Sequence, residues 1–201
     1  MLLGLDFDNT LANYNVAFIS LAIKKNLIDC EWTGNKLSLR NYLRTFPDGE
    51  FVWQQIQGKV YGKWMHEAVL FDGVRSFLSG CKAKNIPVCI VSHKTIYGIH
   101  DDEKIPLREE AWKWMKAQGF FADFGIDESD VYFESTKEEK IKRIESLGCT
   151  HYIDDLLEIL LHPKFPASTK KILFTEEVRQ DDLIDIVSFK DWNELDVDSF
   201  A

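Results

Sequence analysis

The chain has little that would suit it to a disulfide framework, a zinc site or a membrane. No segment approaches the roughly 20 apolar residues that a bilayer-spanning helix needs. No signal-peptide pattern opens the sequence, because Asp6 interrupts its first apolar run. The cysteines are scattered and form no C-x-x-C pair, which predicts reduced and mostly buried thiols; they are Cys30, Cys81, Cys89 and Cys149. We therefore expect a cytoplasmic protein without a membrane partner.

Acidic residues outnumber basic ones, 33 to 24. The 201 residues carry a formal net charge of −9, and no basic tract interrupts it. A nucleic-acid partner is therefore not expected. An acidic protein can still bind an anionic phosphate where a metal ion and nearby lysines reverse the local field. Hydrophobic residues make up 45% and aromatic residues 13% of the chain, enough for a substantial core.

The first ten residues contain the strongest functional signal. The apolar run of residues 1–5 predicts a buried strand, and Asp6-Phe7-Asp8-Asn9-Thr10 follows it directly. Ligands bind at the carboxyl ends of strands in open α/β sheets. Two carboxylates this close repel each other, and a divalent cation relieves that repulsion. The alternative is that Asp6 and Asp8 only cap the next helix, since aspartate is a favoured N-cap.

The rest of the chain alternates between strand and helix patterns. Apolar runs predict four further strands at about residues 85–92, 130–133, 150–153 and 171–174. Helical spacing runs through residues 15–70, and Thr136 with Glu139 forms a capping-box pattern before a helix that stops at Gly148. The tail from residue 180 is expected to form an acidic helix and a loop around Trp192.

This order of elements predicts an α/β fold. We expect a Rossmann-like, doubly wound parallel sheet of about five strands with a small all-helical insert. The catalytic core would comprise residues 1–14 and 71–201, and the helical insert would comprise residues 15–70. Length allows this arrangement of a core domain with a smaller insert.

Polar side chains follow several of these strands. Ser92 ends the second strand, Lys137 begins the helix after the third, and Asp154 and Asp155 end the fourth. The carboxyl ends of parallel strands lie on one edge of a sheet, so these groups should meet Asp6 there. Lys140 competes with Lys137 one turn later. Lys137 is preferred because it lies at the helix start, nearer that edge.

The ordered set of these motifs resembles the haloacid dehalogenase superfamily, and it is most similar to the phosphatases of that family. The family pattern is D-x-D-x-T, then serine or threonine, then lysine, then paired acidic residues. Here it spans nearly the whole chain, from Asp6 to Asp155. The family also inserts a cap between the first and second strands, which matches the helical insert at residues 15–70.

The resemblance implies a role for each catalytic residue. Asp6 would be the nucleophile that forms an aspartyl phosphate. Asp8 would protonate the leaving alcohol and later deprotonate the hydrolytic water. Ser92 would hydrogen-bond the transferring phosphoryl group, and Lys137 would neutralise charge in the transition state.

The resemblance also implies a magnesium cofactor. Asp6 would supply a carboxylate oxygen and Asp8 its backbone carbonyl. Asp154 would bind the ion directly or through water, with Asp155 as a supporting partner or a further ligand. A Mg²⁺ ion would let one anion attack another.

The expected substrate is a small soluble phosphorylated metabolite. A cap of about 55 residues leaves little room for a macromolecule, and a sugar phosphate or nucleotide is favoured. Possible substrate contacts come from Asn9 and Thr10 in the first loop and from His93 and Lys94 after the second strand. Both a monomer and a dimer remain open.

Two alternative functions compete with a phosphomonoester hydrolase. One is a phosphoryl-transfer mutase acting on a sugar phosphate, which Thr10 disfavours slightly relative to the valine associated with such mutases. The other is a non-catalytic relative that binds metal or phosphate, which Asp8 disfavours because a scaffold does not need an acid/base pair. Dehalogenation is also disfavoured, since those enzymes lack the second aspartate.

Overall fold

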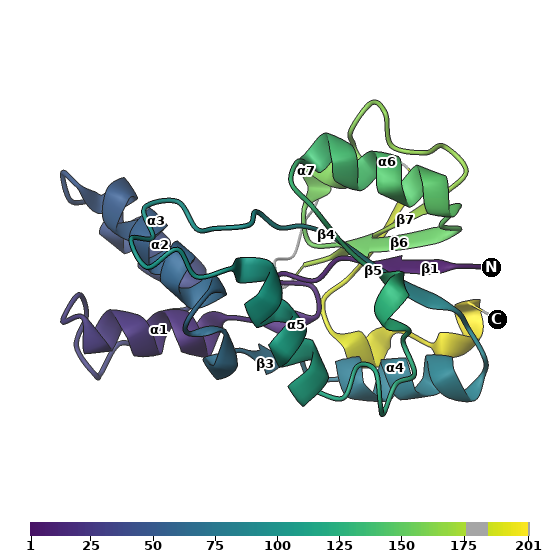
Figure 1. The fold of residues 1–201 in the computed structure, drawn as a ribbon, viewed down its shortest axis with the longest axis horizontal. Coiled ribbons are helices and arrows are strands. Elements are labelled where there is room, and N and C mark those ends of the chain that lie inside the picture. The colour runs from purple at the N-terminus through teal and green to yellow at the C-terminus, as the bar shows by residue number, and fades with distance from the viewer. Residues whose placement is uncertain (176–184, 201) are drawn as a thin grey trace. The chain divides into compact units, whose positions relative to one another are not determined.

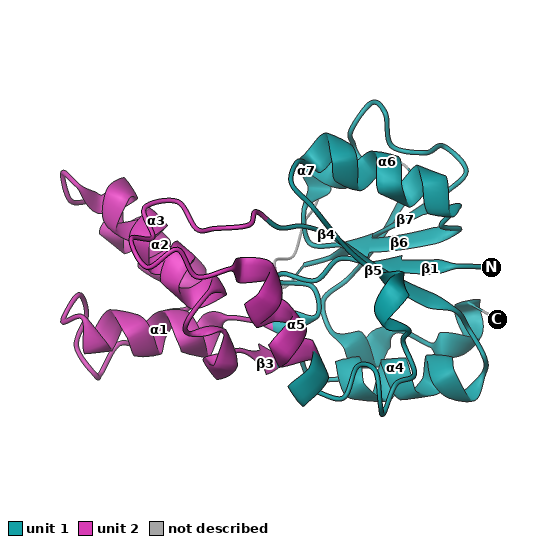
Figure 2. Ribbon diagram, viewed as in Figure 1, with its two compact units in different colours: residues 1–12, 70–94, 116–201 teal, residues 13–69, 95–115 magenta. Residues whose placement is uncertain are grey.

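The computed structural model describes residues 1–175 and 185–200, and it divides into two compact units (Figure 2). The core unit comprises residues 1–12, 70–94 and 116–201, and the helical unit comprises residues 13–69 and 95–115. The predicted division instead placed residues 13–14 and 95–115 in the core and residue 70 in the insert. That the helical unit acts as a cap over a substrate stays a prediction.

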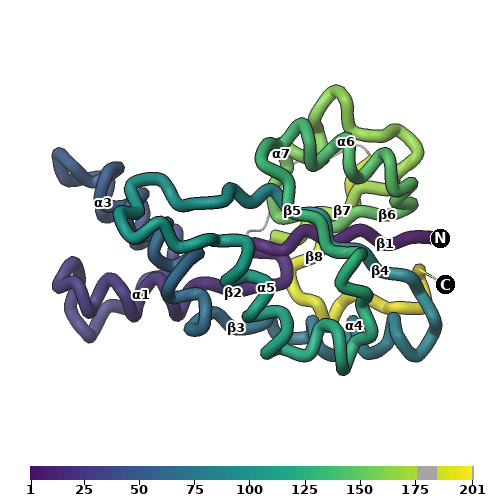
Figure 3. Tube along the Cα trace, in the orientation of Figure 1, coloured from purple at the N-terminus to yellow at the C-terminus, as the bar shows by residue number. Residues whose placement is uncertain are grey.

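A parallel six-stranded sheet forms the centre of the core unit (Figure 1). Its order is β5-β4-β1-β6-β7-β8, so the first strand lies between the strands that carry the other motifs (Figure 3). Every pairing is parallel, which confirms the Rossmann-like α/β prediction. The strands are β1 (Leu3–Leu5), β4 (Val88–His93), β5 (Val131–Glu134), β6 (His151–Asp154), β7 (Lys170–Phe174) and β8 (Ile186–Phe189).

Helices cover both faces of this sheet (Figure 1). On one face, α6 (Lys137–Leu147) and α7 (Leu157–Leu160) pack onto the strands through a buried cluster that includes Ile144 and Leu173. On the other face lies α4 (Val74–Ala83), whose Phe77 contacts the rings of Trp192 and Phe200. Those two rings belong to the short 3-10 helices η3 (Trp192–Glu194) and η4 (Val197–Phe200). A further 3-10 turn, η2 (Glu128–Asp130), precedes β5.

Local sequence signals set the ends of α6. The Thr136 hydroxyl accepts a hydrogen bond from the Glu139 amide at 3.1 Å, and the Glu139 carboxylate accepts one from the Thr136 amide at 3.1 Å. This is the predicted capping box. The helix stops at Gly148, whose φ of 68° lies in the left-handed region that glycine tolerates. The helix that carries Lys137 and Lys140 is thereby fixed at both ends.

The carboxyl-terminal part of the chain was predicted incorrectly. Residues 186–189 form β8 at the edge of the sheet, where part of an acidic helix and a loop was expected, so the described residues form a sheet of six strands where about five were predicted. The strand has four residues, of which only Phe189 is buried, and an acidic stretch precedes it, so it gave no clear strand signal. The first part of the predicted tail, residues 180–184, lies outside the described residues.

The helical unit contains α1 (Asn15–Lys24), α2 (Lys36–Leu43), α3 (Gly49–Tyr61), the 3-10 turn η1 (Met65–Glu67) and most of α5 (Leu107–Ala117). Its core is aromatic, since Phe18 stacks on Trp53 with ring centroids 4.8 Å apart. Two short strands, β2 (Ala12–Asn13) and β3 (Val69–Leu70), pair where the chain enters and leaves this unit.

The loop after β4 belongs to the helical unit because it packs closely against α3. A Cβ on Gly98 would lie 2.5 Å from the Cα of Gly58, so the two backbones approach more closely than any side chain permits. The buried carboxylate of Asp101 holds the loop by accepting a hydrogen bond from the Ile105 amide at 3.0 Å. This packing explains why residues 95–115 group with the helical unit.

Among the described residues, none of the helices has both the length and the hydropathy required to cross a bilayer.

Candidate active site

Asp6 follows β1 directly and lies almost fully buried, with 3% of its surface exposed. The Ser92 hydroxyl donates to its Oδ1 at 2.8 Å, and the Lys140 ammonium donates to the same oxygen at 2.6 Å. Its backbone amide donates to the Ile153 carbonyl at 2.9 Å, which ties the residue to β6. Groups from β4 and α6 thus orient the carboxylate of Asp6, and β6 holds its backbone.

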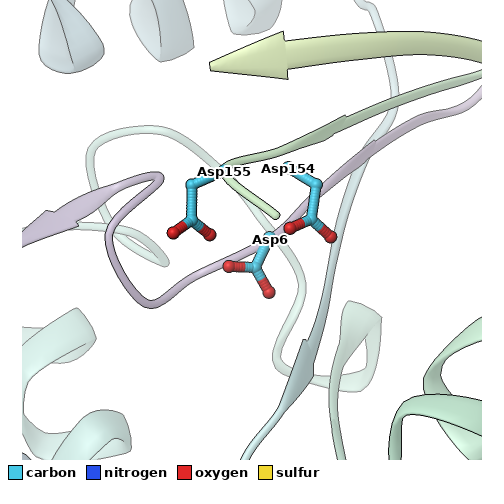
Figure 4. Close-up of side chains that lie close together, drawn as sticks. All are labelled: Asp6, Asp154 and Asp155. Carbon is cyan, nitrogen blue, oxygen red and sulfur yellow. The ribbon is translucent and has the colours of Figure 1, made fainter. Parts of the chain in front are cut away.

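Three carboxylates converge at this edge of the sheet (Figure 4). One oxygen each from Asp6, Asp154 and Asp155 lies within 4.8 Å of the others. Asp154 is the last residue of β6, the neighbour of β1, and is fully buried. The geometric prediction that distant acidic residues meet Asp6 is therefore confirmed, because adjacent parallel strands end at the same edge.

Thr10 links two of these carboxylates. Its hydroxyl oxygen accepts a hydrogen bond from the Asp155 amide at 3.1 Å and lies 3.3 Å from Asp6 Oδ2. The Trp192 indole donates to the Thr10 carbonyl at 3.0 Å, so a residue near the end of the chain supports the first loop. Thr10 is fully buried. In this structure its hydroxyl orders the acidic cluster, while the predicted contact with substrate stays a prediction.

The lysine at the cluster is Lys140, and the preference for Lys137 is corrected. The Lys140 ammonium lies 2.6 Å from Asp6 Oδ1 and 2.7 Å from Asp154 Oδ2, whereas the Lys137 ammonium pairs with Glu158 at 2.6 Å. Side chains on a helix lean toward its N-terminus, so a residue covers the turn before its own Cα. Lys140, one turn inside α6, therefore reaches the sheet edge. Lys137, the first residue of α6, extends beyond that edge.

Burial dominates the electrostatics of Asp154. Loss of hydration raises the pKa of this carboxyl to about 7, although Lys140 favours its charged form. Burial lowers the pKa of the Lys140 ammonium. The attraction of the Asp154 and Asp6 carboxylates outweighs this effect, so the pKa is raised overall. Lys140 therefore stays charged at neutral pH, while Asp154 is poised to change its charge unless a further cation compensates it.

We predict that the metal-free protein loses stability between about pH 4 and pH 7. An unfolded aspartate titrates near 3.9, whereas folded Asp154 titrates at about 7. Between these values the folded state binds the extra proton, so the free energy of unfolding falls as pH rises. Each unit of difference corresponds to about 1.4 kcal/mol. Thermal unfolding in a chelator should show this decline, and Asp154→Asn should flatten it. If the stability of Asp154→Asn fell with pH as steeply as that of the wild type, Asp154 would not be the titrating group.

The residues at the cluster fit a hard divalent cation. Every donor is a carboxylate or hydroxyl oxygen, the ligand type that Mg²⁺ prefers. Asp154 Oδ2 is buried, and the Lys140 ammonium lies 2.7 Å from it. Three carboxylates meet here and one ammonium pairs with two of them, so a divalent cation would balance the remaining negative charge.

Asp8 is oriented differently from the clustered carboxylates. Both of its oxygens accept hydrogen bonds from the Lys94 ammonium, at 2.9 and 2.8 Å. Asn9 follows with a φ of 62°, the left-handed turn that asparagine was expected to tolerate. The His93 ring nitrogen lies 3.0 Å from the Ser135 carbonyl. Contacts of Asn9, His93 and Lys94 with substrate stay predictions.

Tyr152 supports the site, although no motif in the sequence indicated it. Its ring lies beside Gly4, where an added Cβ would come within 2.6 Å of it. Its hydroxyl donates to the Val91 carbonyl in β4, and the Lys140 ammonium lies 5.6 Å from its ring centroid. One side chain on β6 therefore contacts β1, β4 and the site lysine. Gly4 inside an apolar run was the available signal, since a strand glycine often marks a close approach.

Solved structures resemble the chain over nearly its full length. The putative haloacid dehalogenase hydrolase YfnB from Bacillus subtilis matches with a TM-score of 0.57 and 16% identity, covering 96% of this chain and 95% of that one. A haloacid dehalogenase family hydrolase from Deinococcus radiodurans matches with a TM-score of 0.52 and 13% identity, covering 93% and 90%. The chain has the haloacid dehalogenase fold.

The haloacid dehalogenase fold does not by itself name a reaction. Protein tyrosine kinase A from Mycobacterium tuberculosis matches with a TM-score of 0.59 and 12% identity, covering 93% of this chain and 92% of that one. The sequence matches no protein-family model and no curated protein. The function must therefore be argued from the site.

Proposed function

We propose that this protein is a Mg²⁺-dependent phosphomonoester hydrolase of the haloacid dehalogenase superfamily that acts through an aspartyl phosphate on Asp6. The observation that carries the proposal is the meeting of three acidic residues with one lysine and one serine at the end of β1. Each side chain there has the chemistry that phosphoryl transfer from an ester to a carboxylate requires.

The first half-reaction transfers the phosphoryl group to Asp6. A carboxylate oxygen of Asp6 forms a bond to phosphorus while the bond from phosphorus to the ester oxygen breaks. Asp8, two residues further along the same loop, gives its proton to the leaving oxygen, which departs as an alcohol. The product of this step is the aspartyl phosphate and a deprotonated Asp8.

The second half-reaction restores the enzyme. Asp8 removes a proton from a water molecule, and the water oxygen forms a bond to phosphorus as the bond to Asp6 breaks. Inorganic phosphate leaves, and Asp8 again holds the proton. Asp8 therefore acts first as an acid and then as a base, which requires that its carboxylate be held at the leaving-group side of Asp6.

Fixed charges support both half-reactions. Lys140 places an ammonium 2.6 Å from Asp6 Oδ1, where it can balance charge that develops on the phosphoryl oxygens. Ser92 donates to the same oxygen and can transfer this hydrogen bond to the phosphoryl group. Asp6, Asp154 and Asp155, with the Asp8 carbonyl, would hold Mg²⁺, which supplies positive charge between the two reacting anions when it is bound.

Two of the similar structures support this choice of cofactor and ligand. The Bacillus subtilis protein was solved bound to magnesium, and the Deinococcus radiodurans protein was solved with bound phosphate and sodium. We propose that the substrate is a small phosphorylated metabolite, because the helical unit is a compact insert suited to a cap. Neither nucleic acid nor a membrane is the proposed partner.

The proposal is tested by phosphate release from a panel of sugar phosphates, nucleotides and amino-acid phosphates, with Mg²⁺ and with a chelator. We expect release from at least one compound, lost on chelation and restored by Mg²⁺. Isomerisation of a sugar phosphate without phosphate release would indicate the mutase instead. Binding of Mg²⁺ and phosphate without turnover of any compound would indicate the non-catalytic relative.

A further inference from the structure

Lys94, like Lys140, is a buried lysine of the core unit whose ammonium contacts a carboxylate. Its side chain is only 2% exposed, and its ammonium contacts both oxygens of Asp8, which is 17% exposed. A contact of Lys94 with substrate stays a prediction, and in this structure its ammonium pairs with Asp8.

The position of Lys94 is fixed by its backbone. The Lys94 amide donates to the Glu134 carbonyl at 2.9 Å, which extends the pairing of β4 with β5 by one residue. The ammonium also lies 5.4 Å from the ring centroid of Phe7, on the loop that carries Asp8. A lysine held at its backbone and along its side chain presents its ammonium at a defined point.

Contact with both oxygens constrains the carboxylate more than contact with one. A single ammonium shared between Oδ1 and Oδ2 fixes the rotation of the carboxylate about its bond to Cβ as well as its position. Proton transfer requires the donor oxygen to lie within hydrogen-bond reach of the leaving oxygen. Orientation of this kind contributes to rate because it is established before the reaction.

We propose that Lys94 is a positioning residue that orients the Asp8 carboxylate for proton transfer to the leaving group. This rests on the proposed function, in which Asp8 is the acid and base. Lys94 acts through Asp8 and does not itself touch the reacting atoms. The competing interpretation is that the ion pair only stabilises the fold, and the two differ in how activity depends on the leaving group.

The test compares Lys94→Met with wild type on phenyl phosphate and p-nitrophenyl phosphate. The two compounds have similar shapes, but nitrophenolate leaves without protonation, whereas phenolate leaves far more readily when an acid assists it. General acid catalysis contributes roughly 10²–10⁴-fold, so we expect kcat/KM for phenyl phosphate to fall roughly 10- to 100-fold. For p-nitrophenyl phosphate we expect a fall of less than about threefold, because little of that rate depends on an acid.

Two further variants make the comparison decisive. Lys113→Met removes an exposed lysine that pairs with Glu110 and should leave both values of kcat/KM unchanged. In an Asp8→Asn background, Lys94→Met should have no additional effect on phenyl phosphate, because the group that it orients is already lost. Circular dichroism and thermal unfolding would establish that each variant folds, and Lys94→Gln replaces Lys94→Met if the latter does not.

The outcomes separate the two proposals. Lys94 is supported as a positioning residue if the wild type hydrolyses both compounds and the variant loses kcat/KM selectively for phenyl phosphate. Three outcomes would overturn the positioning role of Lys94 while leaving the proposed hydrolase activity intact. They are an equal fall in kcat/KM for both compounds, no fall for either, and a further fall when Lys94→Met is added to Asp8→Asn. Hydrolysis of neither compound, nor of any member of the wider panel, overturns the hydrolase and this inference with it.

Discussion

Replacing Asp6 by asparagine is expected to lower kcat/KM for phosphate release by roughly 10⁴-fold or more, the scale seen when a nucleophile is removed. The amide is nearly the same size and can still accept the hydrogen bond from Ser92, so the loss reflects chemistry at one oxygen. Wild type quenched in acid during turnover should carry a phosphoryl group on the peptide that contains Asp6, detectable by mass spectrometry. The variant should carry none.

A matched control is Asp123→Asn, which makes the same chemical change at an exposed residue. It should retain wild-type kcat/KM. Substantial turnover by Asp6→Asn, or a phosphorylated peptide elsewhere in the chain, would remove Asp6 from the role of nucleophile. Loss of activity in the control as well would indicate that the assay responds to surface charge and not to the site.

Lys140→Met is expected to lower kcat by roughly 10²- to 10³-fold, the range for removal of one group that stabilises charge in a transition state. Lys137→Met should change kcat by less than about threefold, because its ammonium pairs with Glu158 and is 40% exposed. The two lysines lie one turn apart on α6, so each variant serves as the control for the other. A larger effect at position 137 would restore the assignment made from sequence.

The Lys140 variant should also be less stable. Removing the ammonium leaves Asp6 and Asp154 as buried carboxylates without their cation, and breaking a buried ion pair in this way costs about 3–5 kcal/mol. Thermal unfolding in a chelator measures this loss, and Mg²⁺ should recover part of it through binding to the folded state. No such loss is expected for Lys137→Met.

The sequence predicted the architecture of the core because its signals are local. An apolar run before Asp6, a capping box at Thr136 and a glycine at 148 each specify backbone geometry within a few residues. Once parallel strands are assigned, Asp6 and Asp154 are expected at the same edge of the sheet. Their close approach also depends on strand order, which the structure supplies by placing β1 beside β6.

The features that were missed depend on side-chain reach and tertiary packing. Lys137 and Lys140 lie on adjoining parts of the same helix face, and only the lean of the side chains decides which one meets Asp6. The contact of Lys94 with Asp8 joins residues 86 positions apart in the chain. The edge strand β8 is only four residues long and follows an acidic stretch, Asp181 to Asp185, so the sequence was interpreted as a continuous acidic tail.

The central claim is that Asp6, Asp154 and Asp155 share one divalent cation. The most direct test is a crystal of the wild-type protein soaked in Mn²⁺, a substitute for Mg²⁺ that gives an anomalous signal. The account predicts an anomalous peak bonded to oxygens of Asp6 and Asp154, absent from crystals of Asp154→Asn. A peak only at other residues, or none where the carboxylates meet, would contradict it.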